Sequence, residues 1–343
     1  MNRLSDLFPC SAGLFAPPVS QNRPPQLRTL GLALLLGVLG APLAFGQSLN
    51  GAREIPARFI ANRIQVFPVT TAGDTLHLNT DTGGGPPILL RPAVEQLGWP
   101  TETVSRGGRT IKTVSFPDFK AGASIPPPHG RNRFLVLPDK GPATFIDADG
   151  QLGNTWFAGK VWTFDYGAER LLLHDSTETL SFDPEHTVPL AFQTDSTGAH
   201  LRHFPRIEAT IADSTYSFLF DTGATFLLSQ SAQRVFGGSP KQGGSFVIAS
   251  VFDHWRSEHP DWRVLKSAGQ RGERPLIRVP EVTIAGHTVG PVWFERQPDQ
   301  GFQQKLAPLM DRSVEGALGG SLFQYFRITV DYPGERAYFQ NLD

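Results

Sequence analysis

Short apolar runs separated by turn residues dominate the hydrophobic pattern of this chain. Residues 75–80 and 215–220 have the length of strands and contain β-branched or aromatic residues, which strands favour. Residues 91–98 and 229–236 have helical patterns instead, and the first has Pro92 near its start and Gly98 at its end. Together with 35 glycines and 29 prolines, which favour turns, this pattern predicts an all-β protein with a few short helices.

Three further segments carry predictions for the fold. Residues 104–115 form a candidate hairpin with Gly107 and Gly108 at its tip. Residues 245–252 have the pattern of a strand, and residues 299–312 have that of a helix. The charged stretch 253–277 has no clear period, so we assign no element to it.

One tripeptide occurs twice, each time directly after a strand pattern. The two copies are Asp81-Thr82-Gly83 and Asp221-Thr222-Gly223. A single Asp-Thr-Gly after a strand is most simply a tight turn. Two copies in the same setting are hard to explain by chance, so we expect each half of the chain to bring one aspartate to a shared site.

A second repeat follows the first in the same order. Residues 150–173 align without gaps with residues 316–339, and nine of the 24 positions are identical. Because both repeats occur in the same order, they indicate two copies of one domain. We place the N-terminal copy at 47–180 and the C-terminal copy at 181–343, joined by the polar stretch 174–185.

The first 46 residues have the features of a targeting segment. Two arginines, at 23 and 28, precede the apolar run 30–39, and small residues stand at positions 44 and 46. We therefore expect a cleaved signal peptide at 1–46 and an exported protein, periplasmic or extracellular. The alternative is an N-terminal membrane anchor at 29–46, although its apolar run is short for a span. The chain's one cysteine, Cys10, lies in this segment, so we expect no thiol chemistry in the mature protein.

The charge of the chain excludes several classes of partner. A net charge of −1 provides no basic field for nucleic acid and no acidic tail for a cationic partner. Histidines occur around 200–203 and 253–259, but neither group has a second set of ligands at a recognisable spacing. We expect no metal and no other cofactor, and a membrane contact only if the N-terminal segment is retained.

The two tripeptides, each followed later by a Leu-Gly pair at 152–153 or 318–319, resemble the aspartic protease family. The resemblance implies a bilobal acid-protease-like fold, with two related β-barrel-like lobes and a cleft between them. It also implies that Asp81 and Asp221 are the catalytic pair. The other members of the tripeptides would support the site: Thr82, Gly83, Thr222 and Gly223.

The branch of the family is indicated by the aromatic residues. No tyrosine occurs between positions 81 and 150, where pepsin-type members carry one on a flap. The chain therefore looks more like the retropepsin-like and bacterial aspartyl protease branch than like pepsin. By this resemblance, Gly107 and Gly108 are the candidate tip of the flap, and an ordinary hairpin turn is the alternative.

Residues around the aspartates also depart from the family's pattern. Gly84 and Ala224 follow the tripeptides where acid-acting members often carry Ser or Thr, so the carboxylates would receive fewer hydrogen bonds. This predicts a pH optimum nearer neutral than strongly acidic. Thr80 stands where a larger apolar residue commonly precedes the aspartate, which makes Asp81 the less typical half-site.

The function implied by the resemblance is that of an aspartic-type endopeptidase. In this family a shared pair of carboxyl groups activates a water molecule for attack on a peptide bond, which is a known property of the family rather than a result from this sequence. The partner would be a peptide or protein substrate, and one chain with both half-sites is expected to act as a monomer. One alternative is a non-catalytic protein that binds a peptide or an envelope component. Another is a glycoside hydrolase, which nothing else in the sequence supports.

Overall fold

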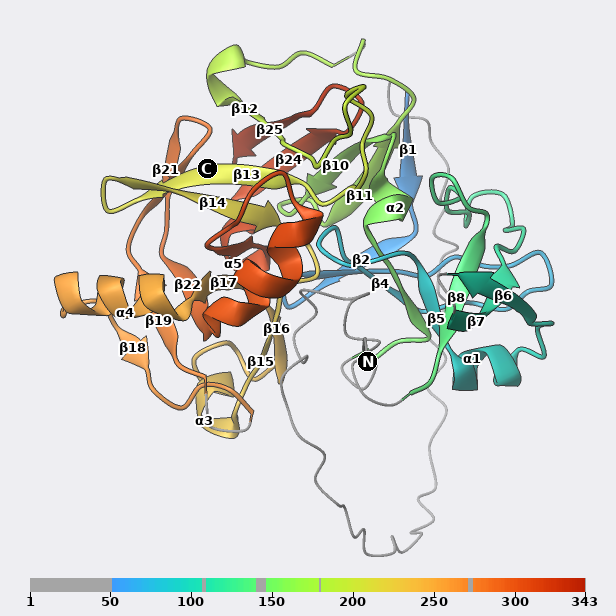
Figure 1. Cartoon of the computed structure of the whole chain (residues 1–343), viewed down its shortest axis with the longest axis horizontal. Helices are drawn as coiled ribbons and strands as arrows, with labels where there is room; N and C mark the ends of the chain where they lie inside the picture. Colours follow the sequence, from blue (N-terminus) through green and yellow to red (C-terminus); the bar gives the residue numbers. More distant parts are fainter. Residues whose placement is uncertain (1–50, 107–108, 140–145, 179, 271–273, 343) are drawn as a thin grey trace, which may run out of the picture.

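The protein is mostly β, with several sheets and a few short helices (Figure 1). The computed structural model describes residues 51–106, 109–139, 146–178, 180–270 and 274–342. The expected signal or anchor segment lies outside the described residues, and so do Gly107 and Gly108. Within the described ranges, no helix has both the length and the apolar character that a membrane span requires.

An eight-stranded sheet contains the strand that leads into the first aspartate. That strand, β4, pairs in parallel with β9, and β9 pairs with β5 in antiparallel fashion. The strands in spatial order are β2 (Ala57–Ile60), β3 (Arg63–Val66), β4 (Leu78–Thr80), β9 (Gly150–Leu152), β5 (Ile88–Leu90), β8 (Arg133–Leu137), β7 (Arg109–Ser115) and β6 (Glu102–Arg106).

A nine-stranded sheet contains the strand that leads into the second aspartate. Here β14 pairs in parallel with β23, and β23 pairs with β17 in antiparallel fashion. The strands in spatial order are β18 (Val264–Leu265), β19 (Leu276–Val279), β22 (Val292–Gln297), β17 (Ser245–Ile248), β23 (Gly316–Leu318), β14 (Ser214–Phe220), β13 (Arg206–Ile211), β20 (Val282–Ile284) and β21 (His287–Val289).

Seven strands of one sheet match seven strands of the other in order and direction. The run β3-β4-β9-β5-β8-β7-β6 corresponds to β13-β14-β23-β17-β22-β19-β18. Parallel pairing joins β4 to β9 and β5 to β8 in the first sheet, and β14 to β23 and β17 to β22 in the second. The remaining neighbours in both runs are antiparallel. The aspartates therefore follow equivalent strands, β4 and β14.

A six-stranded sheet joins strands from the two repeats. Its central pair is β10 with β24, and its register places Thr163 opposite Thr329, which are equivalent residues of the two repeats. Equivalent residues face each other in this way where a local two-fold axis passes between two copies. The strands in order are β1 (Ala52–Ile55), β11 (Arg170–His174), β10 (Val161–Asp165), β24 (Phe326–Asp331), β25 (Arg336–Asn341) and β12 (Thr187–Pro189).

The barrel-like closure that the resemblance implied is not found. Each of the large sheets runs between two edge strands, β2 and β6 in one and β18 and β21 in the other. Closing a barrel requires its first and last strands to pair, and among the described residues they do not. A small separate sheet is formed by β15 (Thr225–Leu227) and β16 (Lys241–Gly243), and β15 follows the second tripeptide closely in sequence.

Helices are few and short. The predictions of helix at 91–98 and of helix at 229–236 agree with the structure, although both helices are shorter than expected. The helix predicted at 299–312 is broken into two short segments, since Pro308 interrupts the pattern. The helical segments are α1 (Arg91–Gln96), α2 (Asn154–Phe157), η3 (Pro184–His186), α3 (Gln230–Gln233), α4 (Ala249–Glu258), η4 (Gly301–Leu306), η5 (Ala307–Leu309) and α5 (Gly320–Phe323).

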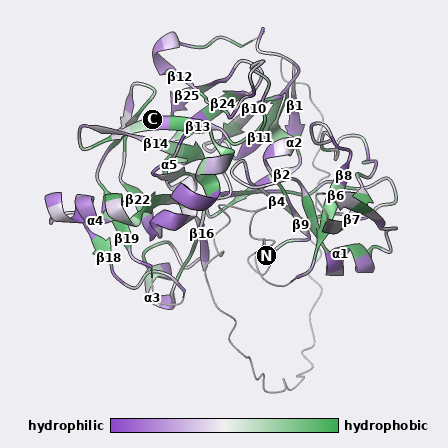
Figure 2. Cartoon of the chain, in the orientation of Figure 1, coloured by the Kyte–Doolittle hydropathy of each residue, from purple (hydrophilic) through white to green (hydrophobic). Residues whose placement is uncertain are grey.

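The strand predicted at 245–252 was wrong in its second half. The strand ends at Ile248, and α4 begins at Ala249 and extends into the region to which we assigned no element. The reason is tertiary: Phe252 and Trp255 stand three residues apart, so one helical face buries both side chains. Figure 2 shows that α4 otherwise consists mainly of hydrophilic residues, which hides the helix from the sequence pattern.

The antiparallel hairpin predicted at 104–115 is present as β6 and β7. One large core of buried aromatic and aliphatic side chains draws on both large sheets and on the six-stranded sheet, with Phe134, Trp162 and Phe294 among its members. Residues of both sequence copies thus pack against one another in this cluster, while a second cluster, which includes Phe226, Leu228 and Leu306, is formed by residues of the C-terminal copy alone.

We expect the two facing threonines to differ in their contribution to stability. Thr163 Oγ1 lies 2.7 Å from Thr329 Oγ1 and 2.8 Å from His174 Nε2, all of them buried. Thr163→Val leaves both partners unsatisfied and should lower the free energy of unfolding by about 1–3 kcal/mol. Thr329→Val should cost less than about 1 kcal/mol, because Thr163 keeps its bond to the histidine. Urea unfolding followed by tryptophan fluorescence measures both, and equal losses would contradict this account.

Candidate functional site

The two tripeptides begin at equivalent points of the two sheets. The Asp81 backbone N–H donates to Leu152 O at 2.9 Å, and the Asp221 backbone N–H donates to Leu318 O at 2.8 Å. Leu152 and Leu318 occupy equivalent positions of the second sequence repeat. Each aspartate is thus held by the end of the strand that pairs in parallel with its own, β9 for β4 and β23 for β14.

The two threonines of the tripeptides bind the loops to one another. The Thr222 backbone N–H donates to Thr82 Oγ1 at 2.9 Å, and the Thr82 backbone N–H donates to Thr222 Oγ1 at 3.2 Å. The Thr82 hydroxyl in turn donates to Phe220 O at 2.8 Å. Both threonines are buried, so water does not compete for these hydrogen bonds, and the bonds fix the separation of the two loops.

Glycine is required in both tripeptides because the carboxyl groups lie against the opposite loop. A Cβ atom on Gly83 would lie 2.5 Å from Asp221 Cγ, and one on Gly223 would lie 2.5 Å from Asp81 Oδ1. Such distances are far inside van der Waals contact. The structure therefore brings the aspartates together, each seated over the glycine of the other tripeptide.

Burial sets the protonation of this pair. Burial raises the pKa of Asp81 to about 6, while hydrogen bonds from Asp221, from the backbone of Gly83 and Gly84 and from Gln151 oppose that shift. Burial raises the pKa of Asp221 well above its ordinary value, and the neighbouring Asp81 carboxylate raises it further. Two buried carboxylates in contact cannot both ionise cheaply, so at neutral pH the pair holds one proton.

One carboxyl oxygen of Asp81 is buried without a hydrogen-bond donor among the described residues, which is consistent with a proton shared by the two carboxyl groups. Asp81 Oδ1 is buried and accepts no hydrogen bond from any N–H or from any hydroxyl of the described residues. By contrast, Asp221 Oδ1 accepts from the Gly223 backbone N–H at 2.9 Å. A proton held between the two carboxyl groups supplies a donor to the Oδ1 atom of Asp81, which would otherwise be buried without one.

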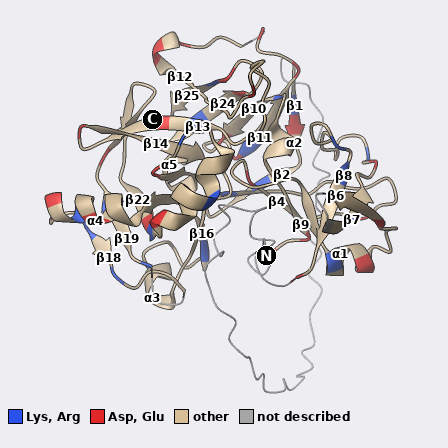
Figure 3. Cartoon of the chain, in the orientation of Figure 1, with Lys and Arg blue, Asp and Glu red and all other residues tan. Residues whose placement is uncertain are grey.

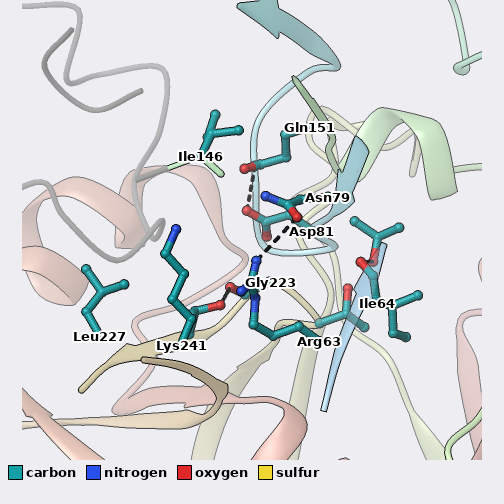
Figure 4. A pocket seen from close by; sticks show the side chains of 12 residues that line it. Arg63, Ile64, Asn79, Asp81, Ile146, Gln151, Gly223, Leu227 and Lys241 are labelled. Atoms are coloured by element: carbon teal, nitrogen blue, oxygen red, sulfur yellow. Dashed lines mark hydrogen bonds between the residues drawn. The ribbon is translucent and has the colours of Figure 1, made fainter. Parts of the chain in front are cut away.

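Gln151 is a residue of the site that the sequence analysis missed. It lies on β9, is buried, and its Nε2 atom donates to Asp81 Oδ2 at 2.6 Å (Figure 4). Its equivalent in the second repeat is Ala317, which has no donor to offer Asp221. The signal was present in the aligned repeats, where a polar residue stands in one buried strand and a small apolar residue in the other.

The presence of Gln151 also explains why glycine follows the first tripeptide. A Cβ atom on Gly84 would lie 2.5 Å from Gln151 Nε2 and 2.6 Å from Asp81 Oδ2. The expectation that glycine at position 84 leaves the Asp81 carboxylate with fewer hydrogen bonds was therefore incomplete, because Gln151 donates one from β9. Thr80, the other unusual residue, is buried, and its hydroxyl donates to Ile64 O at 2.9 Å.

A small cavity opens beside Asp81. Its volume is about 40 Å³, and Asp81, Gln151, Thr222 and Gly223 form one part of its wall. Figure 4 shows Arg63 and Lys241 among the other side chains that surround it. The flap candidate, Gly107 and Gly108, lies outside the described residues, so its position relative to this cavity stays a prediction.

No protein-family model matches the chain, and no curated protein is significantly similar to it. Among the described residues, no group of three or more His, Cys, Asp and Glu side chains is arranged to hold a metal ion. The function must therefore be argued from the geometry of the two aspartates.

We expect the hydrogen bond from Gln151 to lower the pKa of Asp81. Gln151→Met keeps the length of the side chain but removes the donor, so the pKa of Asp81 should rise above about 6. Titration of selectively ¹³C-labelled aspartate carboxyl groups by NMR measures the change. Gln65→Met is the matched control, because Gln65 is also a buried amide of this sheet but donates to Asn79 Oδ1 at 2.9 Å. If Gln151→Met and Gln65→Met give the same titration curve for the Asp81 carboxyl group, Gln151 does not affect the pKa of Asp81.

Proposed function

We propose that this protein is an aspartic-type endopeptidase whose catalytic pair is Asp81 and Asp221. The observation that carries the proposal is the contact between the two buried carboxyl groups, each held by an equivalent strand end and seated over the other loop's glycine. Two carboxyl groups that share one proton provide a base and an acid at the same point, which is what hydrolysis of an amide requires.

The asymmetry of the pair supports a division of roles. Asp81 has the lower pKa of the two and accepts a hydrogen bond from Gln151, so it is the ionised member and the general base. Asp221 retains the proton and is the general acid. In the proposed reaction, water attacks the carbonyl carbon of the scissile amide as Asp81 takes its proton. Asp221 gives its proton to the carbonyl oxygen, which forms a diol. Asp81 then passes the proton that it took from water to the amide nitrogen, while Asp221 takes a proton back from a diol hydroxyl, so the C–N bond breaks and the pair returns to its starting state.

The proposal extends to the fold and to the family. The matching strand orders of the two large sheets and the facing threonines Thr163 and Thr329 are those expected of two related halves of an acid-protease-like fold. We propose that a peptide binds in extended form between these halves, and that the hairpin β6–β7 is the flap. An expected export to the periplasm or the outside of the cell belongs to the same proposal.

The carboxyl geometry argues against the glycoside hydrolase alternative. The two carboxyl groups of such enzymes are about 5 Å apart or more, to leave room for a sugar or a water between them. Here the carboxyl groups are close enough to hydrogen-bond to one another. The non-catalytic alternative is a protein that binds a peptide or an envelope component. Only a measurement of peptide cleavage distinguishes it from the enzyme.

Loss of either carboxyl group should abolish peptide cleavage. We expect Asp81→Asn and Asp221→Asn each to lower kcat by about 10³-fold or more, because each removes one half of the acid–base pair. Cleavage of a diverse peptide mixture by purified protein, read by mass spectrometry, provides the assay. Exposed Asp139→Asn is the control and should keep full activity. Activity that survives Asp81→Asn would refute the shared pair, and an inactive wild type would favour the binding protein.

The rate of cleavage should fall as the pH drops through about 6. Asp81 must be ionised to act as base, and its pKa is raised to about 6, so the acid limb of kcat/KM lies there. The alkaline limb lies higher, since Asp221 must remain protonated and its pKa is raised further. The optimum is therefore nearer neutral than strongly acidic. A profile of kcat/KM against pH with its maximum near pH 2–3 would contradict the assignment of Asp81 as the base.

A further inference from the structure

The peptide group between Leu318 and Gly319 is held at both of its ends. Its carbonyl oxygen, on Leu318, accepts from the Asp221 backbone N–H at 2.8 Å. Its N–H group, on Gly319, donates to Ser245 Oγ at 3.1 Å. Because a peptide group is planar, holding both ends fixes the direction in which the carbonyl oxygen faces Asp221. Ser245 therefore acts on the backbone of Asp221 through a single peptide group.

A second serine supports the first. Ser321 Oγ lies 2.8 Å from Ser245 Oγ and 2.9 Å from Trp293 O, so its hydroxyl can donate to either oxygen. Both serine side chains are buried. Water is therefore not at hand to replace a lost hydroxyl, and without Ser245 the N–H group of Gly319 would lose its acceptor.

Close packing joins the same peptide group to the loop of the second tripeptide. A Cβ atom on Gly319 would lie 2.6 Å from Asp221 O and 2.8 Å from Ala224 Cβ. The backbone N–H of Gly244, the residue before Ser245, donates to Ala224 O at 2.9 Å. These contacts leave the loop little room to move independently of Ser245.

The elements that surround this contact carry no charge. β17, β23 and α5 contain no Lys, Arg, Asp or Glu, and Figure 3 draws β17 and α5 in the colour of the uncharged residues. A neutral hydroxyl in this place adds no charge beside Asp221. Support of this kind therefore does not oppose the proton that the proposed acid must retain.

The N-terminal copy supports its aspartate in a different way. β5 pairs with β9 in the same register as β17 pairs with β23, which places Pro87 where the C-terminal copy has Ser245. Proline has no hydroxyl group to offer. The additional hydrogen bond in that copy goes from Gln151 to the carboxyl group of Asp81. One half thus adds support at the carboxyl group, and the other half adds it at the backbone.

We propose that Ser245 is a positioning residue for Asp221, which it holds in contact with Asp81 through the Leu318–Gly319 peptide group. The proposal rests on the proposed endopeptidase function, in which Asp221 is the general acid. A hydrogen bond donated to the Asp221 carboxyl group would favour its ionised form. A hydrogen bond that acts on the backbone positions the side chain and leaves the proton in place, which suits an acid as the bond from Gln151 suits a base.

Ser245→Ala should alter the chemical step and its dependence on pH. With one end of the peptide group released, Asp221 moves away from Asp81, so kcat should fall about tenfold or more while KM changes little. Weaker contact with the Asp81 carboxylate also lowers the pKa of Asp221. The alkaline limb of kcat/KM should therefore move down by about one pH unit. An alkaline limb that stays in place would overturn the proposal.

Two further variants separate positioning from stability. Thr163→Val removes a buried hydroxyl group far from the tripeptides in sequence and is expected to lower stability, but it should leave kcat and the alkaline limb unchanged. Ser321→Ala removes the support of Ser245 and keeps the acceptor of Gly319, so it should move the limb in the same direction by less. If Ser245→Ala behaves like Thr163→Val, Ser245 has only a structural role. Should Ser245→Ala fail to fold, the shift in Ser321→Ala decides.

Titration of ¹³C-labelled aspartate carboxyl groups by NMR tests the placement of Asp221 without a substrate. Ser245→Ala should lower the higher pKa of the pair by about one unit, and Thr163→Val should not. If the wild type cleaves no peptide but this shift is seen, the endopeptidase function fails and the positioning role stands. If peptides are cleaved and Ser245→Ala changes neither the titration nor the alkaline limb, the function stands and the positioning role fails.

Discussion

The contact between two buried carboxyl groups is the constraint on which the rest of this structure depends. Burying the Asp81 and Asp221 carboxylates in contact with one another is unfavourable, because both would be charged. The cost becomes tolerable when the pair retains one proton. The surrounding features oppose the separation of the pair. Equivalent strand ends hold both backbones, the hydroxyl of Thr82 ties the two loops, and Gly83 and Gly223 leave room for the opposite carboxyl group.

The duplicated framework is symmetric, but the pair within it is not. The matched strand orders and the facing Thr163 and Thr329 make the two halves alike in backbone. Side chains then break the symmetry, since Gln151 serves Asp81 and Ala317 provides no counterpart for Asp221. A symmetric pair would place its proton on either carboxyl group, whereas one extra donor favours a defined base and a defined acid.

The sequence predicted those parts of the site that depend on local pattern. The two Asp-Thr-Gly copies and the hairpin at 104–115 were visible because turn and strand patterns act over a few residues. Gln151 was not singled out, because its partner is 70 residues away and only the pairing of β4 with β9 unites them. The start of α4 was missed for a related reason, since buried Phe252 and Trp255 give a helical face only once the sheet is formed.

The central claim is that one proton resides on Asp221 while Asp81 is ionised, and neutron diffraction tests it most directly. A deuterated crystal near pH 7 should show one deuteron in the pair, bonded to a carboxyl oxygen of Asp221 and directed at Asp81. Gln151 should present its amide deuterons to Asp81 in the same map. Nuclear density for a deuteron on Asp81, or for none on either carboxyl group, would contradict the account.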